Sequence, residues 1–167
     1  MDYLKIVLRL IHIFSGVFWV GGALFLGFFV NPSVQATADS GQKFMAYLMT
    51  KSGLTLRITA AAFLTVLAGG WLYWIDSGSL TSVWMHSATG WGFGIGGIFG
   101  IIGFIFGSMV GRYSSTLGKI ASQIQGKPTP EQMNQIQTIQ KQLSSVSTID
   151  TIALILSLIC MATARYW

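Results

Sequence analysis

Charge is scarce in this sequence. Only 9% of its 167 residues are Asp, Glu, Lys or Arg, whereas 52% are apolar, and the mean hydropathy is +0.62. In soluble domains about a quarter of the residues carry charge. The scarcity excludes an ordinary soluble domain and predicts that much of the chain is surrounded by lipid.

Cysteine is nearly absent too, since Cys160 is the single one. One thiol excludes an intramolecular disulfide, a zinc site built from several cysteines and a covalently attached haem of the CxxCH type. The sequence also lacks a phosphate-binding loop and a nucleophile elbow. Because Cys160 lies inside an apolar run, we expect a buried and unreactive thiol.

Long apolar runs are what the sequence does have. Each of four runs holds about the twenty residues that a helix needs to cross roughly 30 Å of hydrocarbon. The first run is too long for the apolar part of a cleaved signal peptide, which has roughly 7–15 residues. We predict an all-α integral membrane protein, a single four-transmembrane-helix bundle over residues 1–167. The predicted spans are residues 4–30, 54–75, 90–111 and 146–165.

The cations are unequally divided between the two sides of this bundle. Seven lie in the connections between spans one and two and between spans three and four, and three lie on the opposite side. Because cations gather on cytoplasmic loops, these connections should be cytoplasmic and both termini outside. The net charge of +5 then faces lipid headgroups, and no nucleic-acid partner is expected. The seven are Lys43, Lys51, Arg57, Arg112, Lys119, Lys127 and Lys141, and the three are Lys5, Arg9 and Arg165.

The connection between spans three and four has a helical pattern. Apolar residues recur at helical spacing in residues 117–124 and again in 133–143. Between them, Thr129 is placed as an N-cap, with Pro130 at the first helical position and Gln132 at the third, as in a capping box. We predict that helices three and four extend into the cytoplasm as a helical hairpin.

Ionisable residues lie on one face of the first span. At about 100° per residue, six residues spaced by three or four positions share a stripe: Lys5, Arg9, His12, Gly16, Trp19 and Ala23. Ionisable groups inside a membrane face the bundle or a cavity. Either His12 is a neutral histidine that hydrogen-bonds across helices, or it is an axial ligand of haem iron whose second ring nitrogen is held by an acceptor.

The haem interpretation gives the neighbouring residues defined tasks. Gly16, one turn deeper than the histidine, leaves space for a flat porphyrin against the backbone, and Trp19 lies on the same face. Lys5 and Arg9, with Arg165 near the C-terminus, are the cations expected to bind the propionates. The predicted cofactor is a non-covalent b-type haem.

A second axial ligand has few candidates. His86 is the only other histidine, and in the predicted topology it lies on the same side of the membrane as His12. Met85 beside it is an alternative ligand. Two further alternatives stay open: a five-coordinate iron, and an exposed His86 without a ligand role.

The third span carries a stripe of glycines. Such a face permits close helix packing or dimerisation, and a planar cofactor against part of it is the alternative. The stripe consists of Gly92, Gly96, Gly100, Gly103, Gly107 and Gly111.

Asp150 lies near the predicted cytoplasmic start of the fourth span. An acid there is stabilised by the helix dipole, and Arg57 or Arg112 is available as a partner at the same depth. We expect a structural ion pair, with proton conduction as the alternative.

The first span also resembles a known membrane family. In HIFSGVFWVGGALF, which begins at His12, a Trp-x-Gly-Gly motif follows the histidine by seven residues. This pattern is similar to the first helix of the copper-resistance D membrane domain and its relatives, which include the bacterial membrane protoporphyrinogen oxidase. The ending MATARYW is similar to the close of their last helix. The resemblance implies a multi-pass four-helix bundle of the bacterial inner (cell) membrane in which His12 ligates b-type haem.

That oxidase also uses a lysine in its third helix, and residues 90–110 contain none. Three hypotheses of function follow. The first is a b-type cytochrome that transfers electrons at the outer half of the membrane. The second is a copper-handling protein with Met85 and His86 as soft ligands. The third is a structural subunit of a larger membrane complex, joined through its glycine face to a second copy or to partner subunits.

Overall fold

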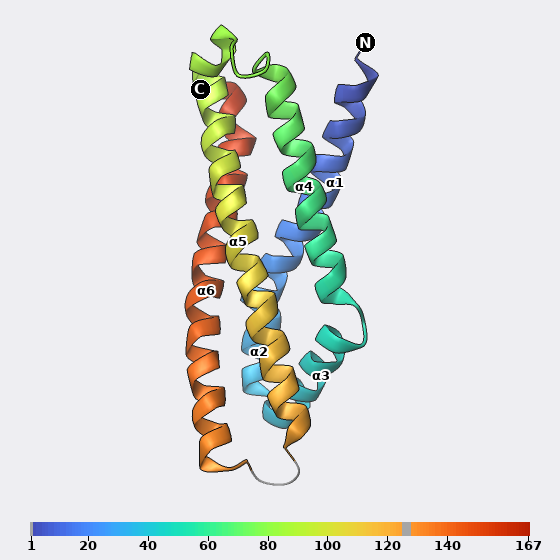
Figure 1. The fold of residues 1–167 in the computed structure, drawn as a ribbon, viewed down its shortest axis with the longest axis vertical. Coiled ribbons are helices and arrows are strands. Elements are labelled where there is room, and N and C mark those ends of the chain that lie inside the picture. Colours follow the sequence, from blue (N-terminus) through green and yellow to red (C-terminus); the bar gives the residue numbers. More distant parts are fainter. Residues whose placement is uncertain (1, 125–127) are drawn as a thin grey trace.

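Figure 1 shows the computed structural model of the chain, which describes residues 2–124 and 128–167. Within these two ranges every regular element is a helix and no strand occurs. Four helical segments are long and apolar enough to cross a membrane: Tyr3–Ala36, Leu54–Asp76, Ala88–Ile120 and Pro130–Tyr166. The predicted all-α fold and the four predicted apolar helices are confirmed.

The first apolar segment is not one regular α-helix. It consists of α1 at Tyr3–Phe25, the π-helical turn η1 at Leu26–Val30, and α2 at Asn31–Ala36. In the π turn the Asn31 N–H donates to the Leu26 carbonyl, five residues back. Pro32 has no N–H, and its ring crowds the carbonyl four residues earlier, so the regular ladder widens just before it. The helical path therefore continues past the predicted end at Val30.

Helix α3, which spans Ala38–Thr50, has no counterpart among the predicted elements. It leads through a sharp turn into α4, which spans Leu54–Asp76. Gly53 makes this turn with a φ of 71°, in the left-handed region where glycine has no steric penalty. The Lys51 amide donates to the Tyr47 carbonyl, so the last turn of α3 is closed before α4 begins.

Helices α5 and α6 are the longest elements. They span Ala88–Gln123 and Pro130–Thr163, with the 3-10 turns η2 at Val83–His86 before α5 and η3 at Ala164–Tyr166 after α6. At 1.5 Å per residue, the 36 residues of α5 form a helix about 54 Å long, well beyond a bilayer core of ~30 Å. The predicted pairing of helices three and four as a hairpin is confirmed. Lys127, one of the predicted cytoplasmic cations, lies outside the described residues.

The helices pack as two antiparallel pairs, α1 with α4 and α5 with α6 (Figure 1). Both termini lie at one end of the bundle, called here the terminal end; α5 ends and α6 begins at the opposite, hairpin end. The two pairs meet in a small apolar core of Trp19, Ala61, Ala62 and Leu154. The Trp19 ring meets Phe104 of α5 edge to face, with ring centroids 6.3 Å apart.

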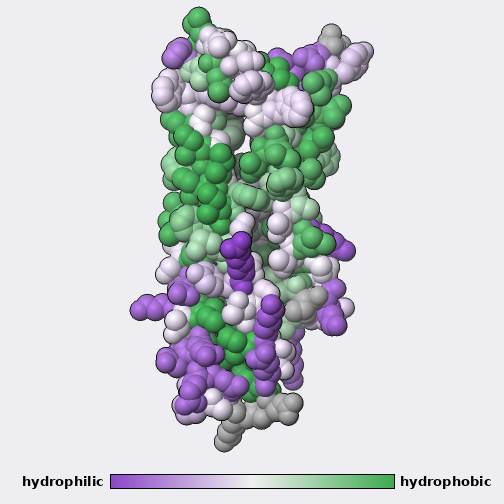
Figure 2. Space-filling view, in the orientation of Figure 1, coloured by the Kyte–Doolittle hydropathy of each residue, from purple (hydrophilic) through white to green (hydrophobic). Residues whose placement is uncertain are grey.

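Apolar side chains form much of the molecular surface. In Figure 2 they form a band nearer the terminal end, and hydrophilic residues gather towards the hairpin end. On α1, for example, Phe14 is 76% and Val17 is 69% exposed. Soluble monomers rarely expose continuous apolar patches larger than a few hundred Å². The surface therefore has the character expected of a bundle surrounded by lipid.

The predicted capping box at the start of α6 is confirmed. The Gln132 amide donates to Thr129 Oγ1 over 3.2 Å, and the Thr129 amide donates to Gln132 Oε1 over 3.0 Å. We expect Thr129→Ala to destabilise the first turn of α6 by about 1 kcal/mol. The Gln132 amide loses its acceptor, and the reciprocal hydrogen bond from the amide of residue 129 loses its support. Hydrogen exchange of the Gln132 amide should accelerate accordingly. Thr138→Ala, which removes an exposed mid-helix hydroxyl, is the control, and equal acceleration in both variants would contradict the capping role.

Candidate functional site

The stripe of α1 that contains His12 packs against α4. The contacts run in antiparallel order: Lys5 with Asp76, His12 with Gly69, Gly16 with Thr65, and Gly22 with Ile58. Each turn forward along α1 is matched by one turn back along α4. The stripe is therefore a helix interface inside the bundle, as its ionisable residues predicted.

The His12 ring is fixed by a hydrogen bond to the α4 backbone. Its Nδ1 lies 2.8 Å from the carbonyl oxygen of Thr65. A carbonyl oxygen can only accept, so Nδ1 carries the hydrogen, and in the neutral ring Nε2 then has a free lone pair. The side chain is half-buried. His12 thus combines an anchored ring with one basic nitrogen that no described residue engages.

Glycine at position 69 makes room for this ring. A Cβ added to Gly69 would lie 2.7 Å from Cε1 and 2.8 Å from Nδ1 of His12. Real Cβ atoms do not approach other atoms so closely, because the overlap is strongly repulsive. Gly70, the next residue, has no atom within 4 Å of its added Cβ. The His12 position therefore depends on one particular glycine of α4.

Two hydroxyl groups lie next to the histidine. Thr65 Oγ1 is 2.9 Å from Ser15 Oγ and 2.7 Å from the Ala61 carbonyl oxygen, while Ser15 Oγ donates to the Ile11 carbonyl. Thr65 is buried. Its carbonyl contacts His12 and its hydroxyl contacts Ser15, so both polar groups of this residue face α1. Sequence reasoning missed Ser15 and Thr65 because the helix that covers the stripe was not specified.

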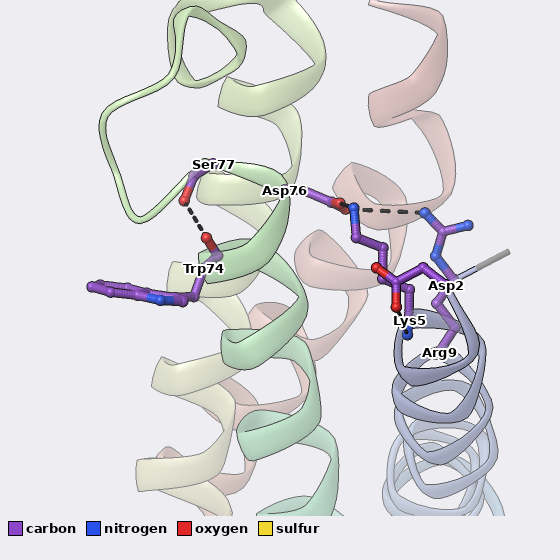
Figure 3. Close-up of polar contacts among 6 residues, drawn as sticks. All are labelled: Asp2, Lys5, Arg9, Trp74, Asp76 and Ser77. Atoms are coloured by element: carbon purple, nitrogen blue, oxygen red, sulfur yellow. Dashed lines mark hydrogen bonds and ion pairs between the residues drawn. The ribbon is translucent and has the colours of Figure 1, made fainter.

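Two of the three predicted propionate cations, Lys5 and Arg9, share one carboxylate. Lys5 Nζ lies 2.8 Å from Asp76 Oδ1, and Arg9 Nη2 lies 4.0 Å from Asp76 Oδ2 (Figure 3). Asp2 caps the start of α1 by accepting from the Lys5 amide, and beside Asp76 the Ser77 hydroxyl donates to the Trp74 carbonyl. The Lys5 and Asp76 side chains are 32% and 28% exposed. Because such partly exposed pairs contribute at most about 1 kcal/mol, both cations can exchange partners at low cost.

The other predicted site residues have different surroundings. Thr65 covers the backbone of Gly16, with its Cγ2 3.4 Å from an added Cβ. The Trp19 side chain is buried in the core between the helix pairs. Arg165 is exposed in η3. The structure thus unites Lys5, Arg9, His12, Gly16 and Trp19 on α1, and places Arg165 on a different element.

Met85 and His86 lie in the 3-10 turn η2 at the terminal end. His86 is exposed, and its side chain forms no hydrogen bond or ion pair with residues 2–124 or 128–167. In the same ranges no three His, Cys, Asp or Glu side chains come together as a potential metal site. The predicted copper ligands Met85 and His86 are therefore not part of any group of three or more His, Cys, Asp or Glu in the described residues.

The glycine stripe of α5 packs against α6 over most of its length. The pairs are Gly92 with Ala164, Gly96 with Cys160, Gly100 with Ser157, Gly103 with Leu154 and Gly107 with Asp150, while Gly111 faces Thr55 of α4. For the first five, an added Cβ would come within 3.3 Å of a residue of α6 or, at Gly92, of Ala164 in η3. Helix packing is therefore the role of residues 92–107, and no planar cofactor fits between them and α6. Cys160 is buried in this interface, as predicted.

The predicted ion pair of Asp150 is wrong. Asp150 is only 7% exposed, and the ion pairs of the described residues involve Asp76 alone. Arg57 and Arg112 are both exposed. The reason is orientation, because Asp150 points to the glycines of α5 whereas the two guanidinium groups lie on the surface.

Comparison with known proteins found no matching family model, curated protein or solved structure. Fold and site therefore define the class: an all-helical protein with four helices long and apolar enough to cross a membrane. It is built from two antiparallel helix pairs, with an anchored histidine between α1 and α4. The resemblance of the His12 segment to the copper-resistance D domain remains a prediction.

Proposed function

We propose that this chain is a multi-pass membrane protein that binds b-type haem through His12 and transfers electrons. The state of the His12 ring is the observation that carries the proposal. A histidine that ligates iron through Nε2 needs a neutral ring whose other N–H is held by an acceptor. The hydrogen bond from Nδ1 to the Thr65 carbonyl supports the second requirement and, in the neutral ring, leaves the Nε2 lone pair for the iron.

Only one protein ligand is part of the proposal. His12 would hold the iron through Nε2, and no second protein ligand is included, because Met85 and His86 lie in η2 and not at the interface of α1 with α4. Haem supplies the one-electron chemistry when bound, and the chain tunes it through ligand identity, burial and nearby charge.

Lys5 and Arg9 are proposed to neutralise the propionates. Lys5 lies about two turns and Arg9 about one turn from His12 on the same stripe, and Asp76 is the partner of both. Propionates would compete with this one carboxylate for two cations, an exchange that costs little at a partly exposed site.

The proposed setting is the bacterial inner membrane with both termini outside. The termini share one end of the bundle (Figure 1), and most cations belong to the connections at the other end, where hydrophilic residues gather (Figure 2). Cation-rich connections favour the cytoplasmic side. The haem site then lies in the outer half of the bilayer, and the α5–α6 hairpin extends into the cytoplasm.

An absorption spectrum of the purified protein tests the haem proposal. We expect wild type, after reconstitution with haem if needed, to show a Soret band and, once reduced with dithionite, the α and β bands of a b-type haem. His12→Ala should abolish these bands because the iron loses its only protein ligand. His86→Ala is the control and should keep them. A wild type that binds no haem, or a His12→Ala variant with an unchanged spectrum, would refute the proposal.

A further inference from the structure

The interface between α5 and α6 encloses a carboxyl group that has no partner. Asp150 Oδ1 is buried and accepts no hydrogen bond from the described residues. It lies against the glycine face of α5, 3.3 Å from an added Cβ of Gly107 and 3.7 Å from one of Gly103. The whole residue is 7% exposed. The group is therefore aimed into the bundle, at the point where α5 has no side chains.

Within residues 2–124 and 128–167, no charged side chain forms an ion pair with this carboxyl. From α5 it faces Gly103 and Gly107, and the nearest cations along α5 and α4, Arg112 and Arg57, are exposed and form no ion pair with described residues. The π turn η1, whose Gly27 lies next to Thr151 of α6, contains no titratable group. An uncompensated carboxylate in such surroundings costs several kcal/mol, so the neutral acid is favoured.

We propose that Asp150 is a proton-binding site inside the bundle. Its carboxyl is protonated while α5 covers it and exchanges that proton with the solution. A proton fits these surroundings better than a metal cation does, because alkali and alkaline-earth ions need several oxygen ligands. No group of three or more His, Cys, Asp or Glu that could hold a metal ion exists in the described ranges, and Asp150 Oδ1 has no hydrogen-bond partner there.

A neighbouring contact shows how the protonated acid is accommodated. Ser157, two turns further along the same face of α6, donates its hydroxyl hydrogen to the Gly96 carbonyl of α5 over 2.8 Å. The carbonyls of the glycine face are thus within reach of short donors from α6, because no Cβ intervenes. A carboxylate has no hydrogen to donate, whereas the neutral acid has one. Protonation therefore gives Asp150 a hydrogen to donate, as the Ser157 hydroxyl does on the same face of α6.

Infrared spectroscopy of the full chain in phosphatidylcholine vesicles tests the proposal. The difference spectrum between wild type and Asp150→Asn should contain the carbonyl band of a neutral carboxylic acid. The band should disappear as the pH is raised from about 5 to about 10, well beyond the ordinary carboxyl range. Asp76→Asn removes the half-exposed, ion-paired aspartate and is the matched control, which should keep the band. The proposal is overturned if no such band belongs to Asp150, or if the band persists unchanged at every pH.

A second measurement needs no variant. Dicyclohexylcarbodiimide adds to a protonated carboxyl in an apolar setting, and the adduct rearranges to a stable N-acylurea that mass spectrometry assigns to a residue. Modification of Asp150 that falls with rising pH supports the proposal, and equal modification at every pH contradicts it. Both measurements are made in choline chloride buffer. Replacing that salt by sodium chloride at fixed pH should change neither the infrared band nor the modification. Loss of both in sodium would identify a metal cation as the occupant and overturn the proposal.

Discussion

Gly92→Ala is expected to destabilise the helix bundle, because the added methyl group has no space against Ala164 in η3, the turn that follows α6. An ideal Cβ at Gly92 would lie 2.7 Å from the Cβ and 2.9 Å from the Cα of Ala164. The Cα belongs to the backbone, so no rotamer change relieves the overlap, and the two helices must separate. Overpacking of this kind costs about 1–3 kcal/mol, which exceeds or offsets the ~1 kcal/mol that alanine gains over glycine in helix propensity.

Gly97→Ala provides the matched control on the same helix. Its added Cβ would have no atom within 4 Å, so it keeps the propensity gain without an overlap. Unfolding in detergent, followed by the helical circular dichroism signal, should show a lower midpoint for Gly92→Ala and an unchanged or higher midpoint for Gly97→Ala. Similar midpoints for the two variants would mean that α5 and α6 are not in the close contact that the glycine face provides.

Much of the fold could be predicted because its signals are local. The apolar runs define helices by length alone, and the capping box at Thr129 needs only residues within one turn. The glycine face was recognisable from its spacing, because residues three and four apart share a side of a helix. Its partner was predictable in principle as well, since α6 follows α5 in a hairpin.

The pairing of α1 with α4 was harder to predict. Spacing showed that Lys5, Arg9 and His12 share a face, but not which helix covers it. These two helices are separated in sequence by α2 and α3, so no short hairpin fixes their register. Asp76 therefore went unrecognised as the partner of Lys5. In antiparallel register, the contact of His12 with Gly69 already places Lys5 beside Asp76.

The incorrect prediction for Asp150 has the same origin. Depth along a helix is readable from the sequence, and it put Arg57 and Arg112 near the level of Asp150. Rotation about the helix axis depends on tertiary packing, and it turns Asp150 towards Gly103 and Gly107. The unpredicted helix α3 has a different reason, because its 13 residues are too few and too polar to stand out as an apolar run.

Gly69→Ala is expected to disrupt the His12 site. The new methyl group would overlap the imidazole at Cε1 and Nδ1, so the ring must leave its position and lose the hydrogen bond to Thr65. Removing such a supporting contact lowers the affinity of a metal ligand by about 10–100-fold. We therefore expect haem titrations of Gly69→Ala to give a dissociation constant that is larger than that of wild type by about this factor.

The control for this variant is Gly70→Ala, in which the added methyl group meets nothing within 4 Å. It should bind haem as wild type does, because both variants gain the same helix propensity and differ only at the ring. Nitrogen NMR of labelled histidine tests the geometry without haem. Wild type and Gly70→Ala should show the tautomer protonated at Nδ1, and Gly69→Ala should lose its dominance. If Gly69→Ala kept both the tautomer and the haem affinity, the ring would not be held against α4. If Gly69→Ala lost the tautomer but kept the haem affinity, the hydrogen bond to Thr65 would be confirmed for wild type, and His12 would not be the haem ligand.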